Sequence, residues 1–313
     1  MIEVNGLTRT YGGFTAVDDV SFTCEPGRVT GFLGPNGAGK TTTMRVMVGL
    51  TPATRGTVTI GGHAYRDLPN PGRHVGVLLD ASAQHAGRTG REILSLGART
   101  MGLPDGRVDE MLAMVSLSDA EASRRMRNYS LGMKQRLGIA HALLGDPEVL
   151  ILDEPANGLD PAGIRWMRDL LRGYAARGGT VLLSSHLLNE VELVADEMIL
   201  IGRGRIVARG DKQSLLAGGA DGGRASTVVS ALDRDALAEA LHQQGYDATP
   251  EGSGFRVAAS TADVGRAALE HLVVLTELRN GSAGLEDLVL ELTSDTQREA
   301  APAATHDTTG AAA

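Results

Sequence analysis

Residues 129–161, YSLGMKQRLGIAHALLGDPEVLILDEPANGLDP, decide the fold of this chain. The stretch opens with a Ser-x-Gly turn at residues 130–132, and a helical pattern follows the turn. It continues into the aliphatic run Val149–Leu152, which is typical of a buried strand in a parallel sheet. That run ends in two adjacent carboxylates, Asp153 and Glu154. The stretch therefore predicts a turn, a helix and a strand that delivers two acidic groups to the edge of a sheet.

A glycine-rich motif stands upstream of this stretch. Residues 34–42, GPNGAGKTT, match the phosphate-binding pattern G-x-x-x-x-G-K-[ST]. A strand-like run at Val29–Phe32 precedes the motif and a helical pattern at Thr41–Leu50 follows it, which is the setting the motif requires. Its glycines let backbone N–H groups point at phosphate oxygens beside a helix N-terminus. We expect the whole loop to contact a nucleoside triphosphate: Gly34, Pro35, Asn36, Gly37, Ala38, Gly39, Lys40, Thr41 and Thr42.

Four side chains of these two motifs have expected chemical roles. Lys40 is expected to place a positive charge on the β- and γ-phosphates, and the Thr41 hydroxyl to bind Mg²⁺. Asp153 is expected to hold a Mg²⁺-bound water, and Glu154 to act on the attacking water as general base or orienting group. The alternatives are a glycine-rich turn that matches by chance and two acids on a solvated turn.

The three motifs, in this order, resemble the nucleotide-binding subunit of the ATP-binding-cassette (ABC) superfamily. The resemblance covers residues 2–210. It implies an α/β P-loop fold with a RecA-like core, a helical subdomain and an antiparallel β subdomain. It also implies that ATP and Mg²⁺ are the ligands, and that the chain is an ATPase. The resemblance further implies a dimer of two copies, in which Lys40 of one copy and Ser130 of the other complete each ATP site.

Further site residues follow from the resemblance. Ser130 and Gly132 are assigned to the γ-phosphate of ATP on the opposite copy, although the chain reads YSLGM where the family has LSGGQ. A plain helix-capping serine is the alternative. His186 in LLSSHLLNE matches a histidine that contacts the γ-phosphate and holds Glu154 and water, so we expect His186, Glu154 and Lys40 to be catalytic. Asp160 matches a loop that links the two ATP sites.

Two further positions are expected to contact the adenine base and the metal ion. Tyr11 matches the aromatic residue that stacks on adenine, and a core tyrosine is its alternative. After the strand-like HVGVLL the family places a glutamine that binds Mg²⁺, but Asp80 stands there and the nearest glutamine is Gln84. Asp80 offers an oxygen to a hard cation but is one methylene shorter. We expect Asp80 to face the metal, and leave open whether Gln84 replaces the usual glutamine instead.

Composition limits where the chain works and what it binds. The 313 residues carry a net charge of -8, which argues against a general nucleic-acid binder. The single cysteine, Cys24, excludes an intramolecular disulfide and is expected to pack in a strand. No apolar run approaches the roughly 18 to 20 residues that cross a bilayer, and the N-terminus lacks the apolar segment of a secretory signal. We therefore expect a protein on the cytoplasmic side of the cell membrane, attached through a separate integral-membrane permease.

Changes in pattern divide the chain into four parts. We expect an ABC ATPase domain at residues 1–216 with its helical subdomain at about 81–128, a linker at 217–225, a small α+β accessory domain at 226–293 and a disordered tail at 294–313. The accessory domain should contain strands at 226–230, 254–259 and 273–278, with helices at 233–242, 262–271 and about 285–292.

Two segments indicate which branch of the family the chain resembles. The ending GLEDLVLELT, residues 284–293, and the α+β module before it resemble drug-export ATPases of the daunorubicin-resistance type. Residues 78–94 resemble the same actinobacterial export group. The resemblance implies that ATP-driven dimerisation powers efflux of drugs or antibiotics through the permease. The alternative is a non-transport ABC ATPase that acts in translation or DNA maintenance.

Overall fold

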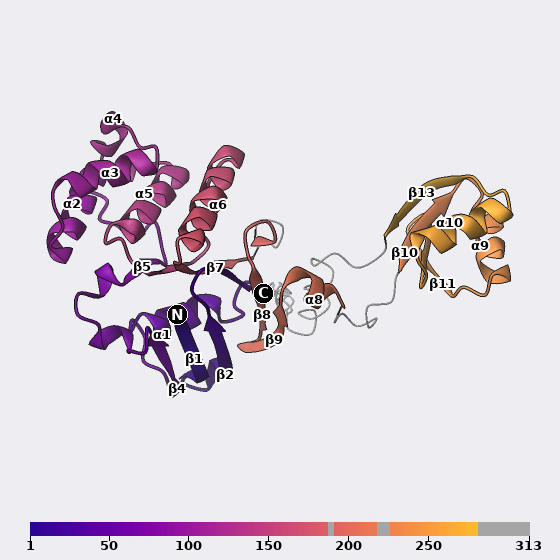
Figure 1. Cartoon of the computed structure of the whole chain (residues 1–313), viewed down its shortest axis with the longest axis horizontal. Helices are drawn as coiled ribbons and strands as arrows, with labels where there is room; N and C mark the ends of the chain where they lie inside the picture. The colour runs from indigo at the N-terminus through magenta and orange to yellow at the C-terminus, as the bar shows by residue number, and fades with distance from the viewer. Residues whose placement is uncertain (187–190, 218–225, 281–313) are drawn as a thin grey trace, which may run out of the picture.

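The computed structural model describes residues 1–186, 191–217 and 226–280 (Figure 1). The predicted helix near residues 285–292, the predicted tail at 294–313 and nearly all of the predicted linker lie outside the described residues. Among the described residues, no helix combines the length and the apolar character that crossing a bilayer requires.

A six-stranded sheet forms the centre of the N-terminal part, in the order β5-β6-β7-β3-β8-β9. All neighbours in it are parallel except β9, which runs antiparallel to β8. The strands are β3 (Val29–Leu33), β5 (Val75–Leu78), β6 (Val149–Leu152), β7 (Thr180–Ser185), β8 (Glu197–Gly202) and β9 (Arg205–Gly210). The strands predicted at Val29–Phe32 and Val149–Leu152 are confirmed as β3 and β6, and the strand-like HVGVLL contains β5.

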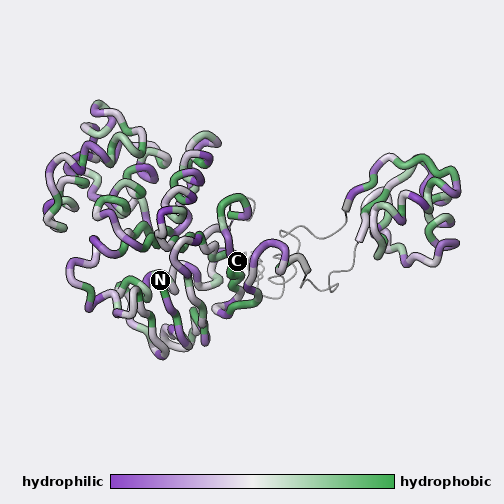
Figure 2. The backbone as a smooth tube through the Cα atoms, in the orientation of Figure 1, coloured by the Kyte–Doolittle hydropathy of each residue, from purple (hydrophilic) through white to green (hydrophobic). Residues whose placement is uncertain are grey.

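Side chains of this sheet alternate between two hydrophobic cores. Leu150 and Leu152 of β6 pack in a core with the helices, whereas Val149 and Ile151 pack in a core with the N-terminal strands. Successive residues of a strand point to opposite faces, so a strand covered on both faces needs an unbroken aliphatic run. In Figure 2 the tube is green along the central strands for this reason.

An antiparallel sheet, β2-β1-β4, covers one of these cores. Its strands are β1 (Ile2–Tyr11), β2 (Phe14–Cys24) and β4 (Arg55–Ile60). Register shifts interrupt the two-residue alternation between β1 and β2 at three places. Cys24 is fully buried in β2, as predicted.

Helices cover the other face of the central sheet. They are α2 (Gly90–Met101), α3 (Gly106–Met114), α4 (Asp119–Ala122), α5 (Leu131–Leu143), α6 (Pro161–Ala176) and α8 (Lys212–Ala217). Helix α1 (Lys40–Met47) instead packs in the core that the antiparallel sheet covers. Short 3₁₀ turns lie at Tyr65–Asp67, Pro71–Arg73 and Met126–Asn128. Figure 1 shows α2 to α5 grouped together, away from β1, β2 and β4. Capping boxes start α2, at Thr89 and Glu92, and α4, at Ser118 and Glu121. The helical pattern predicted for residues 81–128 begins only at Gly90.

The C-terminal part has its own sheet and core. Its elements are β10 (Thr227–Ala231), α9 (Arg234–Gln243), β11 (Ala248–Glu251), β12 (Gly254–Val257), α10 (Thr261–Glu270) and β13 (Leu275–Asn280). The β-α-β-β-α-β order and the antiparallel sheet β11-β12-β10-β13 are those of a ferredoxin-like unit. The strands and helices predicted within residues 226–280 are confirmed. Strand β11, which carries Pro250 at the sheet edge, was not predicted because a proline argues against a strand interior.

Candidate nucleotide site

The carboxyl ends of three neighbouring parallel strands carry the candidate site. The glycine-rich loop follows β3, the two acids Asp153 and Glu154 follow β6, and His186 follows β7, which lies between them. Because parallel strands end at the same edge of a sheet, motifs far apart in the sequence meet there.

Backbone atoms of neighbouring segments pack closely against two glycines of the glycine-rich loop. A side chain at Gly34 would place its Cβ 2.2 Å from the carbonyl oxygen of Ile201, and one at Gly39 would stand 2.6 Å from that of Ala16. Gly39 also has a φ of 110°, which favours glycine, and it precedes the first residue of α1. The loop is therefore fixed in a tight turn that ends at a helix N-terminus, an arrangement that suits phosphate oxygens.

Lys40 lies at the centre of this loop with only 6% of its surface exposed. Its Nζ donates hydrogen bonds to the carbonyl oxygens of Gly34, at 2.6 Å, and Pro35, at 3.3 Å. It also lies 3.7 Å from Oε1 of Glu154. Burial lowers the pKa of Lys40, and the negative charges of Glu154 and Asp153 oppose that shift. A cation is thus held where the phosphates of a nucleotide would lie.

Thr41 and Asp153 bring two oxygen ligands together. The Thr41 hydroxyl donates a hydrogen bond of 2.5 Å to Oδ2 of Asp153, and the Ser184 hydroxyl donates to Oδ1. Hydroxyl and carboxylate oxygens are the ligands that Mg²⁺ prefers, usually alongside water and phosphate. Among the described residues no group of three acidic, histidine or cysteine side chains could hold a metal. The two oxygens of Thr41 and Asp153 suit a Mg²⁺ ion whose other ligands would be water and phosphate oxygens.

Glu154 and His186 form the second contact of the site. Nδ1 of His186 lies 2.8 Å from Oε2 of Glu154, and the backbone N–H of His186 points at the same oxygen at 3.4 Å. Glu154 has a φ of 50°, an unusual value for a residue with a side chain. Strained backbone of this kind persists only where neighbours hold it, and it concentrates at functional sites.

Two residues that sequence reasoning did not assign to the site hold the backbone of Glu154. Gln135, which is 4% exposed on α5, donates its side-chain amide to the carbonyl oxygen of Glu154 at 3.0 Å. Ser184 in β7 accepts the Glu154 N–H at 2.9 Å. The available signal was Ser184 itself, a polar residue that directly follows the aliphatic run 181–183 of β7.

Ser130 and Asp160 both cap helices. The Ser130 hydroxyl accepts the N–H of Met133 at the start of α5, and the Asp160 carboxylate accepts the N–H of Gly163 at the start of α6. Neither hydrogen-bonds the glycine-rich loop within the part of the chain that the structure describes. The capping role of Ser130 is compatible with the predicted role of Ser130 and Gly132 on a second copy, since its hydroxyl stays exposed.

Tyr11 ends β1 with 44% of its surface exposed, so the alternative of a core tyrosine is wrong. The guanidinium carbon of Arg9 lies 4.2 Å from the ring centroid, and the hydrogen bond from Arg9 lowers the pKa of Tyr11. An exposed ring with one supported face suits stacking on a base, and the contact with adenine stays a prediction.

Asp80 is exposed two residues beyond β5, and its Oδ1 accepts the N–H of Ser82 at 2.7 Å. Leu78, the last residue of β5, pairs with Leu152, and its carbonyl oxygen accepts the N–H of Asp153 at 2.7 Å. Asp80 therefore follows the strand next to β6 at the same edge as Asp153. Gln84 is half-buried in the loop before α2. Whether either residue faces a metal stays a prediction.

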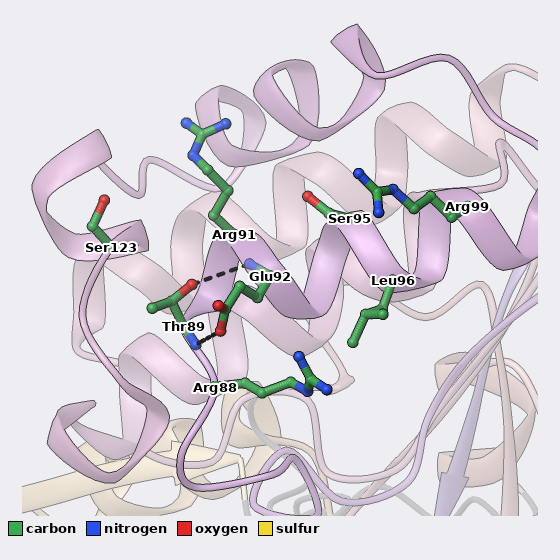
Figure 3. A pocket seen from close by; sticks show the side chains of 8 residues that line it. All are labelled: Arg88, Thr89, Arg91, Glu92, Ser95, Leu96, Arg99 and Ser123. Carbon is green, nitrogen blue, oxygen red and sulfur yellow. Dashed lines mark hydrogen bonds between the residues drawn. The ribbon is translucent and has the colours of Figure 1, made fainter.

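A separate pocket lies on the helical layer (Figure 3). Its lining consists of Arg88, Thr89, Arg91, Glu92, Ser95, Leu96, Arg99 and Ser123. Arg91 is paired with Asp109 and Asp119, and Glu92 is engaged in the capping box of α2. Arg88 and Arg99 form no ion pair with any residue in the described part of the chain. Two guanidinium groups of the lining, those of Arg88 and Arg99, are therefore left without a described acidic partner.

Comparisons with known proteins show which family the chain resembles. A family model described as ABC transporter matches residues 17–157. The chain is 37% identical to the uncharacterized ABC transporter ATP-binding protein YhcH of Bacillus subtilis, over 96% of this chain and 98% of the relative. It is 41% identical to the bacitracin transport ATP-binding protein BcrA of Bacillus licheniformis, over 66% and 68%. It is 38% identical to the Nod factor export ATP-binding protein I of Ralstonia nicotianae, over 69% and 68%.

Solved structures share the fold of the N-terminal part. The structure of an ATP-binding subunit of an ABC transporter superposes with a TM-score of 0.63 and 30% identity, over 69% of this chain and 91% of that one. The dimeric structure of MJ0796, a bacterial ABC transporter cassette, gives a TM-score of 0.60 at 23% identity, over 67% and 98%.

Proposed function

The chain belongs to the ABC transporter family as an ATP-hydrolysing subunit, and from this we propose that two copies close around ATP to drive export of a drug or antibiotic through a separate membrane permease. The observation that carries the proposal is the division of the site. Lys40, Thr41, Asp153, Glu154 and His186 gather at one edge of the sheet. A second group lies at the starts of α5 and α6 and consists of Ser130, Gly132 and Asp160. None of these three residues hydrogen-bonds a described residue of the glycine-rich loop.

In the proposed ATP complex, the glycine-rich loop and Lys40 bind the β- and γ-phosphates, and Tyr11 stacks on adenine. Thr41 and Asp153 hold Mg²⁺, with Asp80 as a further candidate, and the ion neutralises charge on the phosphates when bound. The burial of Lys40 supports this arrangement, because a desolvated charge acts more strongly on an anion than a solvated one.

Glu154 is the proposed general base. It takes a proton from water while the water oxygen bonds to the γ-phosphorus, and the bond from that phosphorus to the oxygen bridging to ADP breaks. The products are ADP and inorganic phosphate. The contact of 2.8 Å between His186 and Glu154 supports a role of His186 in orienting the carboxylate and the γ-phosphate.

Closure by a second copy completes the site in this proposal. The Ser130 hydroxyl and the backbone at Gly132 approach the γ-phosphate bound to the other copy, and Asp160 links the two sites. The N-terminus of α5, capped by Ser130, offers N–H groups and a favourable dipole to an anion. The MJ0796 cassette, which shares the fold, is dimeric.

The permease contact is proposed at the Arg-rich pocket beside α2. Arg88 and Arg99 have charges without described acidic partners, so an acidic segment on the cytoplasmic side of a permease would complement them. In this proposal the protein is peripheral to the cell membrane through that contact.

Export is the proposed direction and drugs or antibiotics the proposed cargo class. The relatives named for bacitracin transport and Nod factor export support this choice, together with the sequence resemblance to the daunorubicin-resistance type. A role in translation or DNA maintenance has less support, since the named relatives are transport proteins.

The experiment is to co-express the chain with a candidate membrane permease from the same organism and to reconstitute the pair in vesicles. We expect Mg²⁺-dependent ATP hydrolysis and ATP-dependent efflux of a peptide or polyketide antibiotic. Hydrolysis without association with any membrane protein, or association with ribosomes or DNA instead, would contradict the proposal.

A further inference from the structure

Helices α5 and α6 start side by side. A side chain at Gly132, in the first turn of α5, would place its Cβ 2.7 Å from the carbonyl oxygen of Gly158, which lies just before α6. Gly158 has a φ of 76°, and a Cβ there would stand 2.4 Å from Cγ of Leu131. Both positions therefore need glycine for the turns before the two helices to touch. The capping residues Ser130 and Asp160 belong to these same two turns.

Arg136 and Trp166 connect the same helices one to two turns further along. The guanidinium carbon of Arg136 lies 4.8 Å from the ring centroid of Trp166, a cation–π contact between α5 and α6. Gly163, in the first turn of α6, leaves room for the side chain of Arg136. A Cβ at Gly163 would stand 3.3 Å from Nη2 of Arg136 and 2.8 Å from Oδ1 of Asp160. The guanidinium thus passes against the turn that Asp160 caps.

The same two side chains also hold the end of α3. Arg136 donates from Nη1 to the carbonyl oxygen of Val115 at 3.0 Å, and Trp166 donates from Nε1 to that of Met114 at 3.2 Å. The last carbonyls of a helix lack partners within the helix, so these donors satisfy them. A cation near a helix C-terminus is favoured by the helix dipole as well. One pair of side chains therefore joins α3, α5 and α6.

We propose that Arg136 and Trp166 are positioning residues that hold the Ser130–Gly132 turn and the Asp160 loop in one fixed arrangement, so that one copy presents both together to the ATP bound by the other. This inference rests on the proposed function, because it concerns the half of the site that a second copy supplies. The pair has no described contact with the glycine-rich loop, so nucleotide binding within one copy does not depend on it.

The physical reason is that, when two copies close around ATP, the Ser130–Gly132 turn and the Asp160 loop must both reach their correct positions at the same time. A misplacement of about 1 Å costs up to about a hundredfold in rate when reacting groups must be aligned. A lysine at position 136 keeps the charge but loses the planar fork that stacks on a ring while donating to a carbonyl. A phenylalanine at position 166 keeps a ring face but loses the N–H donor to Met114.

The test uses the full chain with Arg136→Ala, Arg136→Lys and Trp166→Phe, each with and without Glu154→Gln. We expect Arg136→Ala to lower kcat about ten- to a hundredfold, while the affinity of single copies for a fluorescent ATP analogue stays within about twofold. Arg136→Lys and Trp166→Phe should fall between Arg136→Ala and the parent. In the Glu154→Gln background, Arg136→Ala should raise the ATP concentration needed for dimerisation about tenfold or more.

The matched control is Arg165→Ala on α6. Arg165 is exposed next to Trp166 and has no ion pair or side-chain hydrogen bond with the described residues, so its loss should change none of these quantities. Trp166 is the single tryptophan of the chain, so a change in its emission spectrum in the Arg136 variants reports changed surroundings of this ring. Thermal unfolding midpoints identify any variant that fails to fold. If Arg136→Ala does not fold, the test is decided by the kcat and the dimerisation of Arg136→Lys.

Two results separate failure of this inference from failure of the proposed function. If Glu154→Gln alone does not dimerise with MgATP, the proposed function fails. If Glu154→Gln dimerises, and folded Arg136 variants match it in dimerisation and match the parent in kcat, the positioning role is wrong. A loss of nucleotide affinity in single copies equal to the loss of kcat would also contradict it.

Discussion

Thr41 Oγ1 lies 2.5 Å from Asp153 Oδ2, although 112 positions separate the two residues in the sequence. Thr41 is in the first turn of α1, and Asp153 directly follows β6. The relationship depends on β7, which lies between β3 and β6 and sets the spacing of the two loops. A phosphate-binding motif and a pair of acids thus become one candidate metal-nucleotide site through the order of the strands.

Replacing Lys40 with methionine should separate stability from function. Burial puts the pKa of Lys40 below its ordinary value of 10.5, so its charge costs folding free energy at pH 7. This cost is fully present below the folded pKa and fades as the pH rises through that pKa toward the unfolded value. We expect Lys40→Met to unfold at an equal or higher urea concentration at pH 7, with an advantage that shrinks above the folded pKa. ATP affinity should fall by about tenfold or more.

Equilibrium unfolding in urea and nucleotide binding measure these two effects. A Lys40→Met variant that binds ATP as well as the parent would remove Lys40 from the site. A variant that is markedly less stable at pH 7 would show that the contacts of Lys40 with Gly34 and Glu154 outweigh its burial.

The Cys24 thiol should be inert in the folded protein. Burial raises its pKa to about 12, so almost none of it is the reactive thiolate at pH 8. We expect an aromatic disulfide reagent to leave the native chain unmodified at pH 8 and to label one thiol per chain in urea. Rapid labelling of the native protein would mean that β2 opens far more readily than its buried position implies.

Asp80→Ala should raise the Mg²⁺ concentration that half-saturates ATP hydrolysis, whereas Gln84→Ala should leave it unchanged. The reason is that Asp80 follows the strand next to β6 at the edge that carries Asp153, and its carboxylate is a suitable Mg²⁺ ligand. Asp80→Asn is the control for the local turn, because an amide oxygen can still accept the N–H of Ser82. If Gln84→Ala abolishes hydrolysis and Asp80→Ala does not, the assignment is wrong.

Charge reversal in the Arg-rich pocket should uncouple the subunit from its permease. We expect the double variant Arg88→Glu, Arg99→Glu to hydrolyse ATP alone at the parent rate but to lose co-purification and efflux. Arg55→Glu on β4 lies on the antiparallel sheet, far from α2 in the fold, and is the matched control. Unchanged efflux in the double variant would place the permease contact elsewhere.

The sequence was sufficient to predict which motifs meet at one edge of the sheet. Lys40, Thr41, Asp153 and Glu154 lie together as expected, because each follows a strand whose aliphatic run is easily recognised. Their roles toward a nucleotide stay predictions. The contact of Gln135 with the Glu154 backbone was not predictable, since it depends on how α5 packs against the end of β6. The link between Arg136 and Trp166 likewise needs three helices to be placed.

The fold was predicted well where one pattern dominates. The central strands β3 and β6 are aliphatic on both faces, so their predicted limits were nearly right. The hairpin of β1 and β2 is harder to recognise, because its bulges and one exposed face weaken the alternation on which strand prediction depends. Tyr11 ends the ten-residue strand β1 of this hairpin.

The central claim is that ATP closes two copies of this chain around a site that neither completes alone. The most direct measurement is the molar mass of Glu154→Gln by size-exclusion chromatography with light scattering, in MgATP and in MgADP. We predict a dimer in MgATP and a monomer in MgADP, because blocked hydrolysis keeps the γ-phosphate between the copies. A monomer at saturating MgATP, in the absence and in the presence of the membrane permease, would contradict the account.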